Sequence, residues 1–170
     1  MPAGLKQTSS TVAIGFSVTE SAANTFTQTA VDLNLSPLDR EVFVVQAIDL
    51  TLGAPNALSG IDTAAAASLT TTSQTAVSDL SDSNCMAVAV NQIRAAGFVD
   101  SGVPFSQTAG ESPNTLLEYV GIIATNDFFA QVEGAGNISA LRLTGKIYGY
   151  RARADASIYS ALVQSEVLSA

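Results

Sequence analysis

Few side chains in this sequence are of the types that carry out acid–base or metal chemistry. The 170 residues include no histidine, no tryptophan and a single cysteine, Cys85. Histidine is the usual general base near neutral pH and the commonest metal ligand. Its absence excludes Ser-His-Asp and Cys-His catalysis, and most zinc sites. We therefore expect a protein that is not an enzyme and that holds no cofactor.

The acidic residues offer two candidate sites, and each has a simpler structural interpretation. Asp79, Asp82 and Asn84 group oxygen ligands in one turn, as calcium requires, but the glycine and closing glutamate of a helical calcium loop are missing. We favour turn or helix-cap chemistry for them. The segment 39–41 places two carboxylates around an arginine, which can simply pair with a neighbour. We predict no catalytic and no metal-ligating residue.

Two further motifs also favour structural roles. Cys85 opens an apolar run, so we expect a small buried residue rather than a reactive thiol. The segment 134–136 resembles the start of a dinucleotide-binding fingerprint, but Ser139 stands where the third glycine would be. We interpret that segment as a turn between strands.

Charged residues are scarce and unevenly distributed. The chain is 47% hydrophobic and 13% charged, whereas about a quarter of the residues in a typical domain are charged. Either partners cover much of the surface, which we favour, or the protein is a low-charge monomer. The net charge is −8, with 15 acidic and 7 basic residues. A global positive field for nucleic acid is therefore missing.

The C-terminal part of the chain is locally basic and combines cations with tyrosines. Both tyrosine and arginine are enriched at protein interfaces. We predict a subunit interface made of Arg142, Lys146, Tyr148, Tyr150, Arg151 and Arg153. The alternative is a contact of the 142–153 segment with a genome or an internal membrane.

Apolar residues alternate with a period of two through most of the chain, which predicts strands. The clearest strands are 12–18, 27–35, 40–52, 128–133 and 141–150. We expect Val42, Val44, Ile48 and Leu50 to lie on one face of a central strand and to enter the core. The alanine- and threonine-rich segment 63–78 favours a strand, and 85–96 suits a strand or a helix equally. Residues 116–125 and 128–133 look like a hairpin.

These elements predict an all-β domain, an antiparallel β-sandwich or barrel of eight or nine strands with a short C-terminal helix. We divide the chain into a flexible N-terminal arm (1–11), a β-sandwich domain (12–154) and a helix (155–170) that packs on the domain or on a neighbour. The N-terminus shows no secretory pattern, and no apolar stretch approaches the roughly 18 residues of a membrane span. We expect synthesis in the cytoplasm.

This layout resembles the single jelly-roll capsid proteins of viruses. The features that carry the resemblance are the arm to Thr11, the strand pattern, the loops of small residues and the terminal helix. The resemblance implies two packed four-stranded sheets, location in a virion made in the host cytoplasm, and assembly with copies of itself and other virion proteins. It implies no small-molecule substrate. The arm departs from many genome-packaging capsid proteins because its only cation is Lys6. The alternative function is a non-catalytic β-sandwich module for ligand binding or adhesion.

Overall fold

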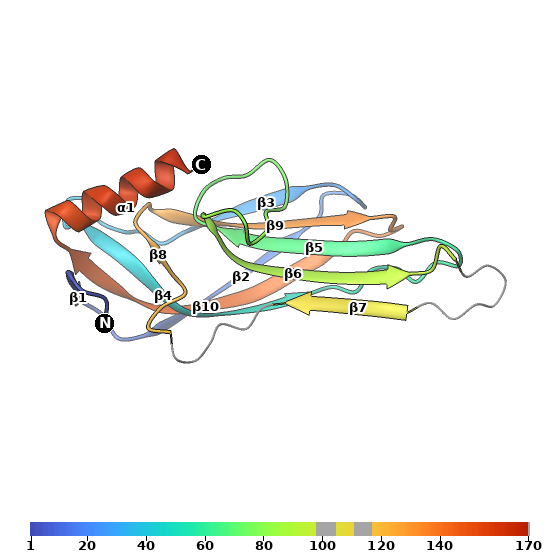
Figure 1. Cartoon of the computed structure of the whole chain (residues 1–170), viewed down its shortest axis with the longest axis horizontal. Coiled ribbons are helices and arrows are strands. Elements are labelled where there is room, and N and C mark those ends of the chain that lie inside the picture. The colour runs from blue at the N-terminus through green and yellow to red at the C-terminus, as the bar shows by residue number, and fades with distance from the viewer. Residues whose placement is uncertain (98–104, 111–116, 170) are drawn as a thin grey trace.

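Alternating apolar residues build two antiparallel sheets that face each other across one core (Figure 1). The computed structural model describes residues 1–97, 105–110 and 117–169. The elements in chain order are β1 (Leu5–Gln7), β2 (Val12–Thr19), β3 (Thr27–Asp32), β4 (Glu41–Leu52), β5 (Thr63–Thr70), β6 (Cys85–Arg94), β7 (Phe105–Gly110), β8 (Gly121–Ile123), β9 (Asp127–Ala135), β10 (Arg142–Ala154) and α1 (Ala156–Leu168).

The strand pairing is that of one long antiparallel ribbon rolled up on itself. Strand β2 pairs with β10, β3 with β9, β4 with β8, and β5 with β6. The roll separates the strands into sheet A, in the order β2-β10-β4-β8, and sheet B, in the order β3-β9-β5-β6. Two such four-stranded sheets define a jelly roll. The predicted β-sandwich of jelly-roll type is therefore confirmed, with β1 and β7 each extending one sheet.

The core between the sheets is made of large apolar side chains from both layers. Phe43 and Leu143 of sheet A and Leu69 and Phe128 of sheet B are almost fully buried. Phe16 meets the ring of Phe128 edge-on, with centroids 5.5 Å apart. Each such side chain contributes about 1.5–3 kcal/mol through burial, so these contacts hold the two sheets together.

A bulge in β4 changes which residues face the core. The register of β4 against β10 skips Gln46, and one extra residue reverses the alternation of side chains. Ile48 therefore faces sheet B, whereas Val42 and Val44 lie on the outer side of sheet A. Leu50 packs against the core but is only partly buried. Val42, Val44 and Ile48 are buried as expected. The expectation that all four residues share one face was wrong, because the sequence pattern does not show a bulge.

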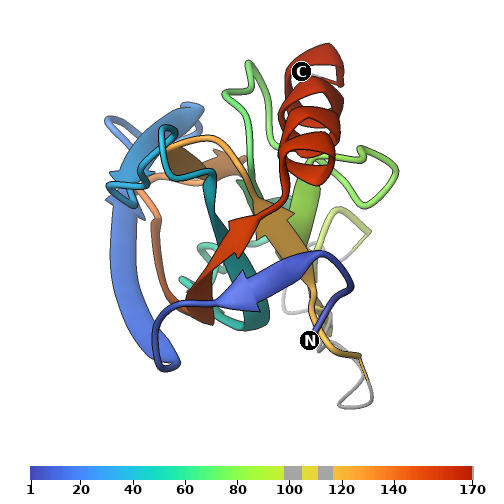
Figure 2. The same ribbon diagram turned by 90° about the vertical axis from the view of Figure 1, so that its left-hand side faces the viewer.

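Helix α1 follows β10 directly and covers part of the outer side of sheet A (Figure 2). Its apolar stripe packs against the second cluster of buried residues; the helix contributes Ile158, Tyr159, Leu162 and Val163, and the cluster under it includes Val42, Val44, Tyr150 and Ala152. The helix thus packs on its own domain. Among the residues that the structure describes, no helix is long and apolar enough to cross a membrane.

A buried carboxylate holds the far end of α1. Glu166 accepts hydrogen bonds from the backbone N–H groups of Ala124 at 2.8 Å and Thr125 at 3.0 Å. Burial raises the pKa of the Glu166 carboxyl, and the two N–H groups oppose that shift. These bonds tie the helix to the connection between β8 and β9.

Three local expectations need correction or completion. The expected arm contains β1, because Leu5 is buried beside Ala154 and pairs with it in register. The expected hairpin of 116–125 with 128–133 does not form, since β8 and β9 lie in different sheets; Leu116 lies outside the described residues. The ambiguous segment 85–96 forms strand β6.

Gly149 lies where β10 and β4 approach most closely, and we expect its substitution to destabilise the domain. A Cβ atom there would collide with the carbonyl oxygen of Val44 and lie 2.6 Å from a ring carbon of Phe43. Gly149→Ala should lower the free energy of unfolding by about 2–3 kcal/mol, measured by denaturant titration. The control is Gly97→Ala, because nothing lies within 4 Å of its added Cβ. Equal stabilities of the two variants would contradict the close approach.

Candidate functional site

Strand β10 carries all six residues predicted for a subunit interface, and the structure divides them between two sides. Arg142 and Lys146 are exposed on the outer side of sheet A, and Tyr148 is half-buried beside them. Tyr150 is only 5% exposed because α1 packs over it. Tyr150 therefore does not reach a neighbour while the helix is docked, contrary to the sequence-based expectation.

Arg151 acts as a clamp within its own chain, with 35% of its side chain exposed. Its guanidinium donates to the carbonyl oxygens of Leu33 at 2.6 Å and Asn34 at 3.1 Å, and to Glu41 at 3.0 Å. Glu41 belongs to β4 of sheet A, whereas residues 33–34 follow β3 of sheet B. The side chain thus closes one end of the sandwich across both sheets.

Arg153 also has a partner within the chain, but a weaker one. Its guanidinium lies 3.4 Å from Asp39, and both side chains are more than half exposed. Exposed pairs contribute little to stability. Of the four predicted interface cations, Arg142 and Lys146 take part in none of the ion pairs found among the described residues.

Around these two cations lies a part of sheet A that α1 does not cover, which we call the bare face. It consists of Ala13, Gly15, Ser17, Thr19, Ala47, Asp49, Thr51, Arg142, Thr144, Lys146 and Tyr148. Most of these side chains are small and exposed. A hollow of about 270 Å³ lies within the face, lined by Asp49, Thr51, Thr144, Gly145 and Lys146. The bare face therefore combines small side chains with two cations and one carboxylate, and it has a shallow hollow beside Lys146.

The outer side of sheet B is partly covered by the connection between β5 and β6. A buried amide, Gln131, donates to Thr70 at 2.7 Å and to Gln28 at 2.9 Å, and accepts from Ser68 at 2.7 Å. The Ser68 hydroxyl also accepts the backbone N–H of Ser78. This network fixes the 71–84 connection on the sheet. The only sign of this network in the sequence was a glutamine within the apolar run from Phe128 to Val132.

That connection contains an ordered acidic turn, residues 79–82. The Asp79 carboxylate accepts the N–H of Ser81 at 2.9 Å and also its hydroxyl, and Asp82 accepts the N–H of Asn84 at 2.9 Å. The bonds from Ser81 lower the pKa of the Asp79 carboxyl. The carboxylates therefore form turn contacts, as favoured over calcium binding. Leu80 is 47% exposed within the turn.

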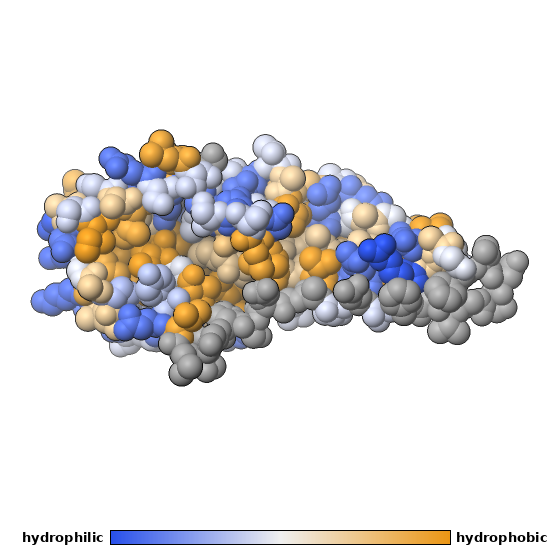
Figure 3. Space-filling model, viewed as in Figure 1, coloured by the Kyte–Doolittle hydropathy of each residue, from blue (hydrophilic) through white to orange (hydrophobic). Residues whose placement is uncertain are grey.

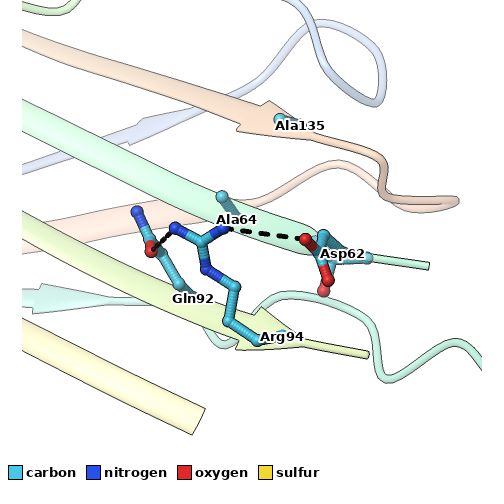
Figure 4. Close-up of a pocket in the computed structure, with 6 residues that line it drawn as sticks. Asp62, Ala64, Gln92, Arg94 and Ala135 are labelled. Carbon is cyan, nitrogen blue, oxygen red and sulfur yellow. Dashed lines mark hydrogen bonds and ion pairs between the residues drawn. The ribbon is translucent and has the colours of Figure 1, made fainter. Parts of the chain in front are cut away.

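A second hollow, of about 180 Å³, lies where β5 begins and where β6 and β9 end (Figure 4). Arg94 reaches across it to Gln92 at 3.2 Å and to Asp62 at 3.7 Å. Asp62 also accepts the backbone N–H groups of Ala95 and Ala96. These N–H groups, Ala96 first, and then Arg94 lower the pKa of the Asp62 carboxyl. Asp62 thus connects the start of β5 to the residues that follow β6, and a carboxyl with a lowered pKa is poorly suited to donate a proton.

Cys85 is half-buried at the start of β6. Burial, together with the nearby charges of Asp82 and Asp79, raises the pKa of its thiol to about 11. A protonated thiol is a poor nucleophile and a poor metal ligand. Within the described residues, no three cysteine or acidic side chains gather closely enough to hold a metal ion.

The end of the sandwich where β10 begins is held by amide side chains. Asn137 and Asn24 exchange hydrogen bonds of 2.8 Å, and Asn56 donates its backbone N–H to Asn137. The buried Glu20 accepts three backbone N–H groups. Next to this network, Ile138 is 74% exposed. An apolar side chain is therefore presented to solvent on an ordered loop.

The fold thus defines the class of protein as a jelly-roll β-sandwich. No family model and no curated protein matches the sequence. Among solved structures, the chain is similar to one from Desmodium yellow mottle tymovirus, with 16% identity and a TM-score of 0.32 over 92% of this chain and 96% of that chain. A likeness of this size does not establish a shared function, which has to be argued from the structure itself.

The clamp role of Arg151 predicts a difference between two neighbouring arginines. Arg151→Ala removes partners from two carbonyl oxygens and from Glu41, so unfolding should become easier by about 2 kcal/mol. Arg153→Ala breaks only an exposed pair and should change stability by about 0.5 kcal/mol or less. Thermal and denaturant unfolding of the two variants compare them directly. A stability loss in Arg153→Ala as large as in Arg151→Ala would contradict the role of Arg151 in holding the two sheets together.

The raised pKa of Cys85 predicts slow alkylation at neutral pH. Since the thiolate is the reactive form, the rate of labelling by iodoacetamide should rise about tenfold per pH unit up to the pKa of about 11. A cysteine-containing peptide, labelled under the same conditions, should level off above its pKa of about 8.5. A plateau for Cys85 near pH 9 would mean that the thiol is not shielded.

Proposed function

We propose that this protein is a structural subunit of a viral capsid or a similar homo-oligomeric shell. The observation that carries the proposal is a jelly roll whose outer sides are short of charge. Jelly rolls occur in viral capsid proteins, lectin domains and cupins, so the fold by itself is an analogy. Histidine is the commonest metal ligand and general base in proteins, and this chain has no histidine. The character of the surface supports a shell subunit over the other functions.

The exposed surface has the composition of a surface that neighbours cover. The bare face is made mainly of alanine, glycine, serine and threonine. Apolar side chains are exposed at separate places: Ile138 is 74% exposed before β10 begins, and Leu168 is 84% exposed at the C-terminal end of α1. Figure 3 shows further apolar surface beside α1 and along the middle of the viewed side. Apolar groups on several sides of one molecule favour a subunit with several neighbours.

The charges of the 142–153 segment favour binding to other copies of the chain over binding to a genome. Of the cations in the 142–153 segment, Arg151 and Arg153 are paired with Glu41 and Asp39. Binding to nucleic acid depends on the number of phosphates that cations neutralise, and in this segment only Arg142 and Lys146 are outside the ion pairs found among the described residues. We therefore propose copies of this chain and other virion proteins as partners, and the virion as the location.

Sedimentation velocity over a range of concentrations, combined with electron microscopy of the same samples, tests the proposal. We expect species of many times the 17.4 kDa chain mass, visible as closed particles, with a monomer only at low concentration. Because a shell subunit meets several neighbours, it buries more than the roughly 1,600 Å² of a single standard interface. A chain that stays monomeric at its highest soluble concentration would contradict the proposal and favour the ligand-binding alternative.

A further inference from the structure

The bare face has a charge and a shape that fit a particular kind of partner. Arg142 and Lys146 outnumber its single acidic residue, Asp49, so the face is locally positive on a chain whose net charge is −8. The hollow beside Lys146 is lined by Thr51, Thr144 and Gly145, with Asp49 also at its wall, and it opens to solvent. A projecting apolar side chain with carboxylates next to it would complement both properties.

The acidic turn has these properties and lies on the opposite side of the same molecule. Leu80 is 47% exposed between Asp79 and Asp82. The hydrogen bonds within the turn fix its shape, and the bond of Ser78 to Ser68 holds it on the outer side of sheet B. The bare face lies on the outer side of sheet A. The two surfaces cannot meet within one chain, but they can meet between two.

We propose that the acidic turn of one copy docks on the bare face of the next, with Leu80 in the hollow and the Asp79 and Asp82 carboxylates facing Lys146 and Arg142. The proposal rests on the proposed function and names one of its contacts. Such a contact is head-to-tail, because each copy offers a different surface to each neighbour. Head-to-tail contacts close into rings when the rotation between copies allows it, which suits a shell.

The other exposed leucine turn does not fit the bare face equally well. Leu38 is 95% exposed, but its neighbour Asp39 is already paired with Arg153, and a further cation, Arg40, directly follows Asp39. Because the negative charge of this turn is already neutralised and a cation lies next to it, the positive charge of the bare face would not attract it. The turn at Leu38 therefore serves as a control.

Charge reversal with rescue tests the contact. Lys146→Glu places a carboxylate beside the incoming acidic turn, and Leu80→Lys places a cation against the native face while keeping the hydrogen bonds of Asp79 and Asp82. Each variant should raise the concentration needed for particle formation about tenfold or more, because like charges meet at the contact. The double variant Lys146→Glu/Leu80→Lys restores opposite charges and should recover assembly to within about threefold of wild type.

Matched controls separate the contact from net charge and from folding. Lys6→Glu changes the net charge as Lys146→Glu does, and Leu38→Lys changes it as Leu80→Lys does, but neither residue lies on the bare face or in the acidic turn. Both controls should assemble like the wild type, and thermal unfolding should show all variants folded. Added salt should weaken wild-type assembly, since it screens the charges.

The outcomes distinguish this proposal from the proposed function. If wild-type particles form and Lys146→Glu assembles normally, the docking surface is wrong while the shell function stands. If both single variants fail to assemble and the double variant does not recover, Leu80 and Lys146 are not partners and the proposal is overturned. If the wild type forms no particle, both proposals fail.

Discussion

The pairing of β10 with β4 is the constraint on which the rest of the structure depends. It runs from Leu143 opposite Leu52 to Arg153 opposite Glu41, and β10 also carries β1 and β2 on its other edge. The bulge at Gln46 divides this pairing into two parts. Toward the C-terminal end of β10, the outward residues of sheet A are apolar and α1 covers them. Toward the start of β10, the outward residues are those of the bare face, which α1 does not cover. One extra residue thus separates a covered part of sheet A from the bare face.

The same pairing decides what each cation of β10 does. Because side chains alternate along the strand, Arg142 and Lys146 point outward and Arg151 points to the other side of sheet A. At the end of the sandwich, the Arg151 guanidinium donates hydrogen bonds to Glu41 and to two carbonyl oxygens. Stability and association are therefore assigned to different residues of one strand. A mutation at Arg151 acts on folding first, so its effect on assembly would not report on an interface. Lys146 takes part in none of the ion pairs found among the described residues, so a substitution there separates the effect on association from the effect on folding.

Alternating hydrophobicity was enough to predict the sandwich, the terminal helix and most strands. The register between paired strands could not be predicted, because it depends on which strands are neighbours in the sheet. The pattern of β4 therefore suggested one continuous face, and residues 116–125 suggested a hairpin that the rolled ribbon does not allow. For the candidate site, the composition of the 142–153 segment correctly singled out a basic strand. It could not show that α1 covers Tyr150 or that Arg151 meets Glu41, because both follow from contacts distant in sequence.

Electron cryo-microscopy of the assembled protein tests the central claim most directly, because it shows which surfaces meet between copies. The account predicts closed particles in which each copy keeps its jelly roll and its docked α1, and in which the bare face around Lys146 is covered by the 79–82 turn of a neighbour. Particles in which the bare face points to solvent would contradict the assigned contact. A protein found only as separate monomers, at every concentration imaged, would contradict the shell itself.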